Sequence, residues 1–177
     1  MRFDGLAVGI CRKVAARALL AATLVVAGAS GATAEDDRAF LAFGAGWFDF
    51  NDNEQSVEFH AEIRTDYKFL WIFNPIAGLI VNTDRAVYGY GGLQVDIFLG
   101  RHVVLTPSIS VGYYEEGSSK DLGHPIEFRS AVELAYRFEN RSRIGIQIYH
   151  MSNARLDDVN PGTEVVAITY ARPFGGP

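Results

Sequence analysis

Apolar and polar residues alternate at every second position along most of the chain beyond residue 37. In the segment 126–139 the even-numbered positions are mostly apolar, whereas all of the charged residues stand at odd-numbered positions. The segment 55–68 alternates in the same way. Successive side chains of a β-strand point to opposite faces, so this period predicts strands with one apolar and one polar face.

The alternation recurs in eight segments, which are separated by clusters of Gly, Asn, Asp and Ser. Such clusters are typical of turns between strands. We therefore predict strands at 38–50, 55–68, 72–83, 86–99, 102–115, 126–139, 142–153 and 163–172. No stretch beyond residue 37 has the run of about 18 apolar residues that a transmembrane helix requires.

Two architectures have this alternation. In a soluble sandwich the apolar face packs on a core, whereas in an outer-membrane barrel it faces lipid and the polar face lines the interior. The even count of eight favours the barrel, as do aromatic residues near the predicted strand ends, which are typical of a membrane girdle. These aromatic residues are Trp47, Phe48, Phe50, Tyr67, Phe69, Trp71, Tyr113 and Tyr114. Charged positions of both signs, such as Glu133 beside Arg129 and Arg137, predict a lumen filled by paired side chains.

The N-terminal segment also favours an exported protein. Residues 1–34 have a basic start, the apolar run ALLAATLVVAGASG and the small residues ATA before Glu35. This is the layout of a secretory signal peptide, and the apolar run is shorter than the ~20 residues of a membrane-spanning helix. We predict a signal peptide at 1–34 and an all-β, eight-stranded antiparallel transmembrane β-barrel of the outer membrane at 35–177.

The amino-acid composition excludes some classes of chemistry and partner. The single cysteine, Cys11, lies in the predicted signal, so residues 35–177 have no thiol or disulfide chemistry. The same residues carry 12 Lys and Arg against 20 Asp and Glu, a formal net charge of −8. This balance argues against a nucleic-acid partner, which would need a basic face. No cluster of His, Cys and Asp has metal-ligand spacing, and we expect no cofactor.

Three polar residues interrupt the apolar face of the last two predicted strands. Counting by twos from Ile148 reaches His150 and then Ser152, and Glu164 has the parity of its apolar strand neighbours Val166 and Ile168. With both barrel ends of the chain in the periplasm, these side chains lie at the outer rim, where facing residues of neighbouring strands are ~4.5–5.5 Å apart.

The three side chains have the roles of a hydrolytic triad. Histidine accepts the proton of a serine hydroxyl, and a carboxylate on the other ring nitrogen orients the imidazole. The alternative is that His150, Ser152 and Glu164 are solvated rim residues, with the sequence Asn160-Pro161-Gly162 acting only as a turn. The residues by themselves leave this alternative open.

The stretch HMSNARLDDVNPGTE closely resembles the signature of the lipid A 3-O-deacylases, the PagL family. The matching positions are His150, Ser152, Asn153, Ala154, Asn160, Gly162 and Glu164. The resemblance implies an outer-membrane barrel that hydrolyses the 3-O-linked acyl ester of lipid A, a component of lipopolysaccharide. It implies Ser152 as the nucleophile, His150 as the base and Glu164 as the residue that orients it.

The resemblance further implies Asn153 as an oxyanion donor, together with a backbone N–H from the loop that begins at Ala154. The expected partners are lipid A in the outer leaflet and the outer membrane itself, and a homodimer is left open. Apolar residues on the same face are candidates for contact with the acyl chain. They are Ile146, Ile148, Val166 and Ile168. Two other functions stay open, a non-catalytic structural or adhesive barrel and another barrel lipid enzyme such as a phospholipase or acyltransferase.

Overall fold

The structure is a computed structural model that describes residues 38–174, all of them in one compact unit. The signal predicted at 1–34 and the start of the barrel domain at residue 35 lie outside the described residues. The strands are β1 (Ala39–Phe48), β2 (Ser56–Arg64), β3 (Asn74–Asn82), β4 (Val87–Gln94), β5 (Ile97–Leu99), β6 (Val103–Glu115), β7 (Ile126–Arg137), β8 (Arg143–Ser152) and β9 (Thr163–Phe174). Within 38–174, no helix is long and apolar enough to cross a membrane.

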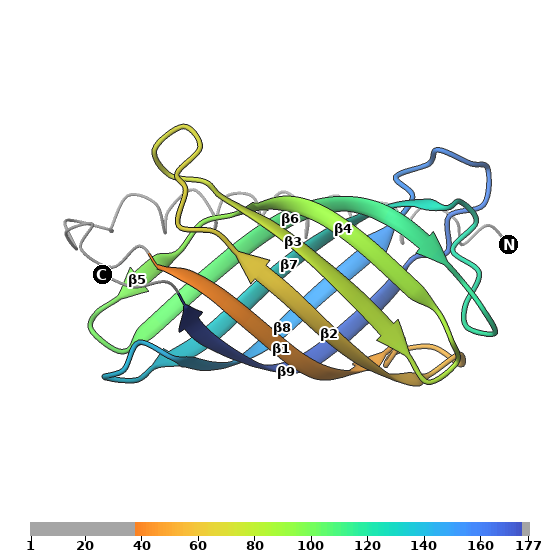
Figure 1. The fold of residues 1–177 in the computed structure, drawn as a ribbon. Helices are drawn as coiled ribbons and strands as arrows, with labels where there is room; N and C mark the ends of the chain where they lie inside the picture. Colours follow the sequence, from red (N-terminus) through yellow and green to blue (C-terminus); the bar gives the residue numbers. More distant parts are fainter. Residues whose placement is uncertain (1–37, 175–177) are drawn as a thin grey trace, which may run out of the picture. The chain divides into compact units, whose positions relative to one another are not determined.

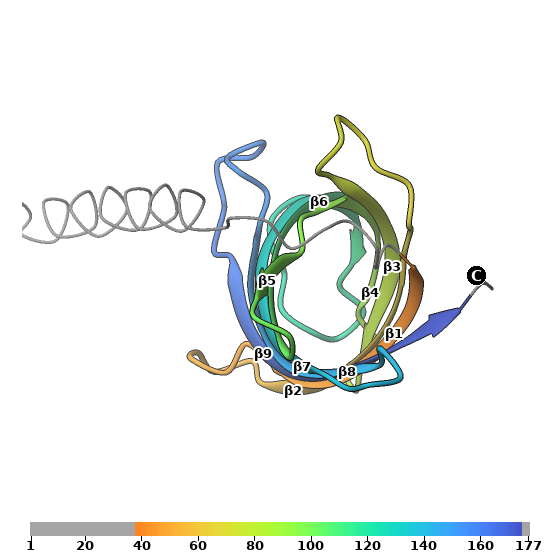
Figure 2. The same ribbon diagram turned by 90° about the vertical axis from the view of Figure 1, so that its left-hand side faces the viewer.

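The strands form a closed antiparallel barrel (Figures 1 and 2). Strands that follow one another in the chain pair with each other, except β4 and β5; β1 pairs with β9, and β4 pairs with β6. Since β4 and β5 both pair with β6, they occupy one strand position in the barrel wall. The wall therefore has eight strand positions. The predicted fold class is therefore confirmed.

The fourth predicted strand, 86–99, is divided into β4 and β5. The break lies opposite Pro107 of β6, which has no N–H to donate to the ladder. Beside it, the Asp96 carboxylate accepts hydrogen bonds from Thr106 Oγ1 at 2.8 Å and from Arg143 Nη1 at 2.7 Å. The break between β4 and β5 thus places the Asp96 carboxylate toward the interior of the barrel.

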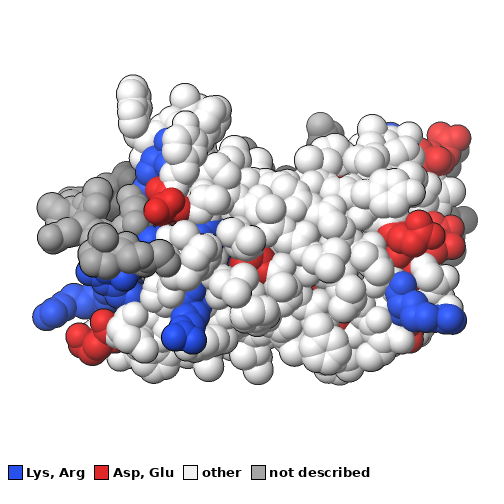
Figure 3. All heavy atoms as spheres, in the orientation of Figure 1, with Lys and Arg blue, Asp and Glu red and all other residues white. Residues whose placement is uncertain are grey.

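The alternation of the sequence is inverted relative to a soluble protein. Along β7, the outward-facing Val132 and Leu134 are about half exposed, whereas the inward-facing Arg129 and Glu133 are 1 % exposed. In the space-filling view, charged side chains gather at the two ends and the wall between them is almost free of charge (Figure 3). This apolar belt is the surface that a lipid bilayer solvates.

Inside the barrel, charged side chains pair across the lumen. Arg64 of β2 donates two hydrogen bonds to the Glu133 carboxylate, at 2.9 and 2.8 Å, and one to Glu62 at 2.8 Å. The lumen therefore holds paired charges of both signs, and the partner of Glu133 comes from another strand, not from its neighbours on β7. The guanidinium of Arg129 instead lies over the ring of Tyr149, 4.3 Å from its centroid.

The two ends of the barrel differ. The terminal end carries the start of β1, the end of β9 and the connections 65–73, 100–102 and 138–142; the loop end carries the connections 49–55, 83–86, 116–125 and 153–162.

The aromatic girdle is smaller than predicted. Phe48 and Tyr114 are 2 % and 5 % exposed and pack inside the barrel, whereas Trp47 and Tyr113 lie on the outer wall. Neighbouring aromatic residues at a strand end alternate in face like any others, so only every second one reaches the membrane side.

Candidate functional site

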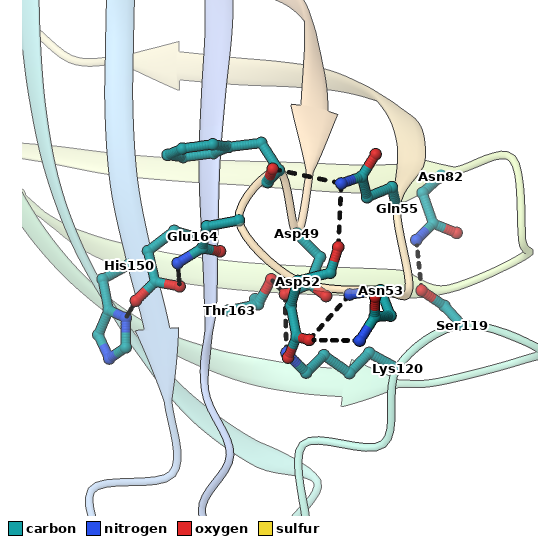
Figure 4. Close-up of polar contacts among 12 residues, drawn as sticks. Asp49, Asp52, Asn53, Gln55, Asn82, Ser119, Lys120, His150, Thr163 and Glu164 are labelled. Atoms are coloured by element: carbon teal, nitrogen blue, oxygen red, sulfur yellow. Dashed lines mark hydrogen bonds and ion pairs between the residues drawn. The ribbon is translucent and has the colours of Figure 1, made fainter.

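The site lies at the loop end, where β8 and β9 run into the connection 153–162. His150 of β8 and Glu164 of β9 are register partners, although 14 positions separate them in the chain. Facing residues of an antiparallel pair present their side chains on the same side, and the Nδ1 atom of His150 lies 3.0 Å from Oε1 of Glu164. The two side chains point toward each other (Figure 4), and both are partly exposed, at 49 % and 39 %. This contact occupies one imidazole nitrogen and leaves Nε2 for a second partner.

Ser152 lies two residues beyond His150 on the same face of β8, at half-buried depth. Within 38–174, no hydrogen bond joins its hydroxyl to His150. Catalytic hydrogen bonds are often long without substrate and tighten when substrate binds. The structure therefore places the three predicted residues on one outward face, with the histidine–carboxylate contact formed.

A second serine also lies beside the histidine. Ser130 of β7 is exposed and is the register partner of His150 on the strand opposite to Glu164. Sequence reasoning did not single it out, because its nearness to His150 depends on the pairing of β7 with β8. Ser130 has no place in the HMSNARLDDVNPGTE signature, and it supplies a control for Ser152.

Glu164 has a further partner that the sequence analysis missed. Asn51, in the connection between β1 and β2, donates a hydrogen bond from Nδ2 to Oε2 of Glu164 at 2.9 Å. The backbone N–H of Phe50 in the same connection donates to the Glu164 carbonyl at 3.3 Å. The two carboxylate oxygens of Glu164 are thus divided between His150 and Asn51. The closure of β1 onto β9 creates this contact, so the expected barrel closure was the signal that pointed to it.

The side chain of Asn153 is engaged in the scaffold. Asn153 is fully buried, and its Nδ2 donates to the carbonyls of Leu122 at 2.9 Å and Val159 at 2.8 Å. Its backbone N–H donates to Asn160 Oδ1 at 3.0 Å. These bonds use both amide hydrogens, so the side-chain oxyanion role expected for Asn153 is not supported. Asn153 and Asn160 instead fix the shape of the connection.

The remaining signature residues shape the surroundings of the histidine. Ala154 has a positive φ of 53°, which turns the chain away from the strand directly after Asn153. Gly162 has a φ of 68°, and a Cβ atom there would lie 2.8 Å from Cε1 of His150. Glycine at this position allows both the backbone conformation and the close approach to the imidazole ring.

Below the triad, the four predicted acyl-contact residues lie together on the outer wall. Ile148 is the register partner of Val166, and Ile146 is that of Ile168. Three of them are more than half exposed, and Val166 is half-buried. They form an apolar strip that runs from His150 and Glu164 toward the middle of the belt.

Behind the triad, an ionic cluster built on the buried Asp49 and Lys120 and the exposed Asp52 joins three segments of the loop end (Figure 4). The Lys120 ammonium donates to Asp49 Oδ1 at 2.7 Å and to Asp52 Oδ2 at 3.0 Å, and Thr163 Oγ1 donates to Asp49 at 2.9 Å. The hydrogen bond from Lys120 lowers the pKa of Asp52. Burial alone would lower the pKa of Lys120, but its hydrogen bonds to Asp49 and Asp52 raise it overall. Since Thr163 precedes Glu164, the cluster holds the start of β9.

Within 38–174, no group of three or more His, Cys, Asp or Glu side chains has an arrangement that could hold a metal ion.

Comparison with known proteins places this geometry in a family. The profile of the family described as Lipid A 3-O-deacylase (PagL) matches residues 82–173, more than half of the chain, and the match includes His150, Ser152 and Glu164. The chain belongs to this family. A lipid A deacylase PagL of Bordetella bronchiseptica is 32 % identical over 57 residues, which span 32 % of each chain.

Solved structures agree on the fold. The crystal structure of the outer membrane enzyme PagL superposes with a TM-score of 0.60 at 16 % identity, over 76 % of this chain and 99 % of that one. A de novo designed transmembrane β-barrel and the Neisserial surface protein A each give a TM-score of 0.56, at 12 % and 9 % identity, over 79 % and 82 % of this chain and 98 % and 100 % of theirs. A family member, a designed barrel and a surface protein share one architecture, so the fold alone does not decide the activity.

Proposed function

We propose that this chain is an outer-membrane serine esterase that hydrolyses the 3-O-linked acyl chain of lipid A. The observation that carries the proposal is the contact between His150 and Glu164 on the lipid-facing wall of a chain that belongs to the lipid A 3-O-deacylase family. A substrate dissolved in the outer leaflet reaches the barrel from the lipid side, and this wall is where a triad must lie to meet it.

In the proposed reaction, Ser152 Oγ attacks the ester carbonyl while Nε2 of His150 takes the hydroxyl proton. Glu164 accepts the Nδ1–H hydrogen bond and stabilises the imidazolium that forms. The tetrahedral intermediate collapses with cleavage of the bond between the acyl carbon and the 3-oxygen of the sugar, His150 protonates this leaving oxygen to give the 3-hydroxyl, and the hydroxyacyl chain stays on Ser152 as an ester. Water, activated by His150, then hydrolyses this acyl-enzyme and releases a 3-hydroxy fatty acid.

The oxyanion of the intermediate needs hydrogen-bond donors near Ser152. Because the Asn153 amide is occupied, we assign this role to the backbone N–H of Ala154, the first residue of the turn that follows. The positive φ of Ala154 supports the assignment, since it changes the direction of the chain next to the nucleophile.

The apolar strip gives the acyl chain a path. With the terminal end in the periplasm and the loop end outside, the strip formed by Ile146, Ile148, Val166 and Ile168 extends from the triad toward the middle of the membrane. The sugar then lies at the rim, and the ester lies between the sugar and the strip.

The test is mass spectrometry of lipid A from Gram-negative cells that lack a deacylase of their own. Cells that produce the chain are expected to lose one 3-hydroxyacyl group from lipid A, and Ser152→Ala is expected to reduce the rate by a factor on the order of 10³ or more. Ser130→Ala is the matched control, because Ser130 also borders His150 on the outer face, and it should leave the rate unchanged.

Three outcomes would contradict the proposal in different ways. Activity that survives Ser152→Ala but not Ser130→Ala would make Ser130 the nucleophile. Cleavage of phospholipid with intact lipid A would indicate another lipid enzyme. A folded barrel that leaves both lipids intact would indicate a structural or adhesive role.

A further inference from the structure

The connection between β2 and β3 at the terminal end is an apolar hairpin. It spans residues 65–73, and its large apolar residues around the tip are as exposed as those of the outer wall, with Trp71 more exposed than any other large apolar side chain of the described residues. They are Tyr67 at 64 %, Phe69 at 45 %, Leu70 at 63 %, Trp71 at 90 % and Ile72 at 54 %. An exposed cluster of this kind marks an interaction site.

The backbone of the hairpin is ordered by hydrogen bonds at its tip and at its base. Phe69 and Phe73 exchange two backbone hydrogen bonds, of 2.7 and 3.0 Å, which close its tip. At its base, the buried Asn74 donates from Nδ2 to the carbonyls of Thr65 at 3.1 Å and Tyr67 at 3.3 Å. The exposed side chains are therefore presented on an ordered support.

The residues at the tip are not those that the turn itself favours. Leu70 and Trp71 have φ values of 49° and 64°, a region that glycine and asparagine occupy most readily. Two large apolar residues in this conformation gain nothing from the turn and make little contact within the barrel. Their presence indicates that the side chains serve a contact outside it.

The hairpin leaves the barrel sideways. In the side view it rises away from the wall, and in the view along the barrel it again projects beyond the ring of strands (Figures 1 and 2). The apolar tip therefore lies beside the outer wall, continuous with the apolar belt at its terminal-end edge, where Ile63 at the end of β2 is 48 % exposed.

The charges at the terminal end of the barrel favour phospholipid headgroups as the partner of the hairpin. At the terminal end basic side chains outnumber acidic ones, and both colours appear around the left end of Figure 3. The basic residues there include Arg38, Lys68, Arg101, Arg141 and Arg172, and the acidic residues of the same connections are Asp66 and Glu139. Aromatic residues beside basic ones are the combination that anchors proteins at the level of phospholipid headgroups.

We propose that the hairpin 65–73 is an interfacial anchor that inserts Leu70 and Trp71 into the headgroup region of the periplasmic, phospholipid leaflet. It would fix the depth and tilt of the barrel from the side opposite to the catalytic rim. The proposal rests on a barrel that spans the membrane and not on its catalytic activity.

Tryptophan fluorescence tests the proposal directly, because Trp47 and Trp71 are the two tryptophans of the chain. The Trp47→Phe variant is folded into phosphatidylcholine vesicles that contain lipids brominated at defined acyl positions. We expect the emission of Trp71 to be shifted to the blue relative to a water-exposed indole and to be weakly quenched by acrylamide. Shallow bromines should quench it several-fold more strongly than bromines near the bilayer centre.

The reciprocal Trp71→Phe variant is the control. Trp47 lies on the outer wall near the loop end, so brominated lipids should quench it and report that the barrel is inserted. Folding is verified by heat-modifiable electrophoretic mobility, and Trp47→Tyr replaces Trp47→Phe if the latter does not fold.

Two results would overturn the proposal. Water-like emission of Trp71 with full acrylamide quenching would show that the hairpin stands in the aqueous phase. Protection from acrylamide without quenching by any brominated lipid, with barrels that cross-link as pairs, would show that a second copy covers it. Either result leaves the lipid A assay unaffected, so the failure of this proposal and that of the catalytic proposal are distinguishable.

Discussion

At the scale of single residues, the Glu164 carboxylate has one contact on each of its two oxygens. Its Oε1 contacts the histidine ring and its Oε2 accepts the hydrogen bond of Asn51, which comes from the opposite edge of the β1–β9 seam. A carboxylate that orients a catalytic histidine works through its direction as well as its charge. Asn51 is therefore a positioning residue in the proposed mechanism, since it restricts the rotation of the Glu164 carboxylate.

Replacing Asn51 tests this role. Asn51→Ala removes one hydrogen bond to a carboxylate, and such bonds contribute about 1.5–3 kcal/mol. We expect kcat for lipid A deacylation to fall about tenfold or more, with KM little changed, because Asn51 does not touch the substrate in the proposed reaction.

The control is Asn53→Ala in the same exposed connection, where the side chain contacts only Asp52 among the described residues. An equal loss of kcat in both variants would trace the effect to the connection as a whole and would contradict the role of Asn51.

At the scale of elements, three connections at the loop end are tied together behind the triad. Lys120 comes from the connection between β6 and β7, Asp49 and Asp52 from that between β1 and β2, and Thr163 from the start of β9. Leu122 and Val159 accept the hydrogen bonds of Asn153 and join the β6–β7 connection to the β8–β9 connection. The outer rim is thus one cross-linked cap, in which the strands that carry the proposed triad are braced from inside the barrel.

Lys120→Met tests the cap and its pH dependence. The substitution leaves the buried Asp49 without its cation, which costs about 1–3 kcal/mol of unfolding free energy near neutral pH. Because the pKa of Asp52 is lowered by the hydrogen bond from Lys120, its contribution to the unfolding free energy is present above the ordinary aspartate pKa of 3.8 and is lost as the pH falls through the folded-state pKa. Because the pKa of Lys120 is raised, its contribution to the unfolding free energy is complete below the ordinary lysine pKa of 10.5. This contribution is lost as the pH rises through the folded-state pKa.

The stability difference between wild type and Lys120→Met is therefore expected to be largest between about pH 4 and pH 10. It should shrink at either extreme, as measured by thermal unfolding of the barrel in detergent. Arg85→Met is the matched control, since the exposed Arg85 also links two connections through its bond to Ser118. It should change the unfolding free energy by less than about 0.5 kcal/mol. A pH-independent difference would contradict the assigned ionic role.

At the scale of the whole molecule, the barrel has its apolar surface outside and its charges inside. The lumen is stabilised by pairs between distant strands, of which Arg64 and Glu133 are the most completely bonded. Each of these side chains is at most 2 % exposed, so neither charge is solvated by bulk water. The bilayer solvates the outer wall, and ion pairs fill the space that a hydrophobic core occupies in a soluble protein.

Glu133→Gln tests this arrangement. The variant leaves the guanidinium of Arg64 in the lumen without its bidentate carboxylate, and breaking a buried pair in this way costs about 3–5 kcal/mol. Urea unfolding of the barrel in vesicles should show this loss. The double variant Arg64→Met with Glu133→Leu removes both charges and is expected to recover part of the stability, since Glu62 keeps the hydrogen bond from Tyr90 but loses that from Arg64. A double variant no more stable than Glu133→Gln would contradict the explanation.

The sequence by itself determined most of the fold. The two-residue period of a strand and the residues of the turns between strands are local properties. The approximate positions of the eight barrel strands, and the face on which their side chains lie, could therefore be predicted from the chain alone. The common face of His150, Ser152 and Glu164 follows from the same parity. The break between β4 and β5 could not be predicted in this way, because it lies opposite Pro107 on another strand.

Only the tertiary structure decided which residues meet. The contact of Asn51 with Glu164 depends on closure of β1 onto β9, and that of Glu133 with Arg64 depends on which strands face each other across the lumen. The buried bonds of Asn153 depend on how two connections fold over the rim. Parity assigns a side chain to a face, but its partner is set by strand register and barrel closure, which bring together residues far apart in the chain.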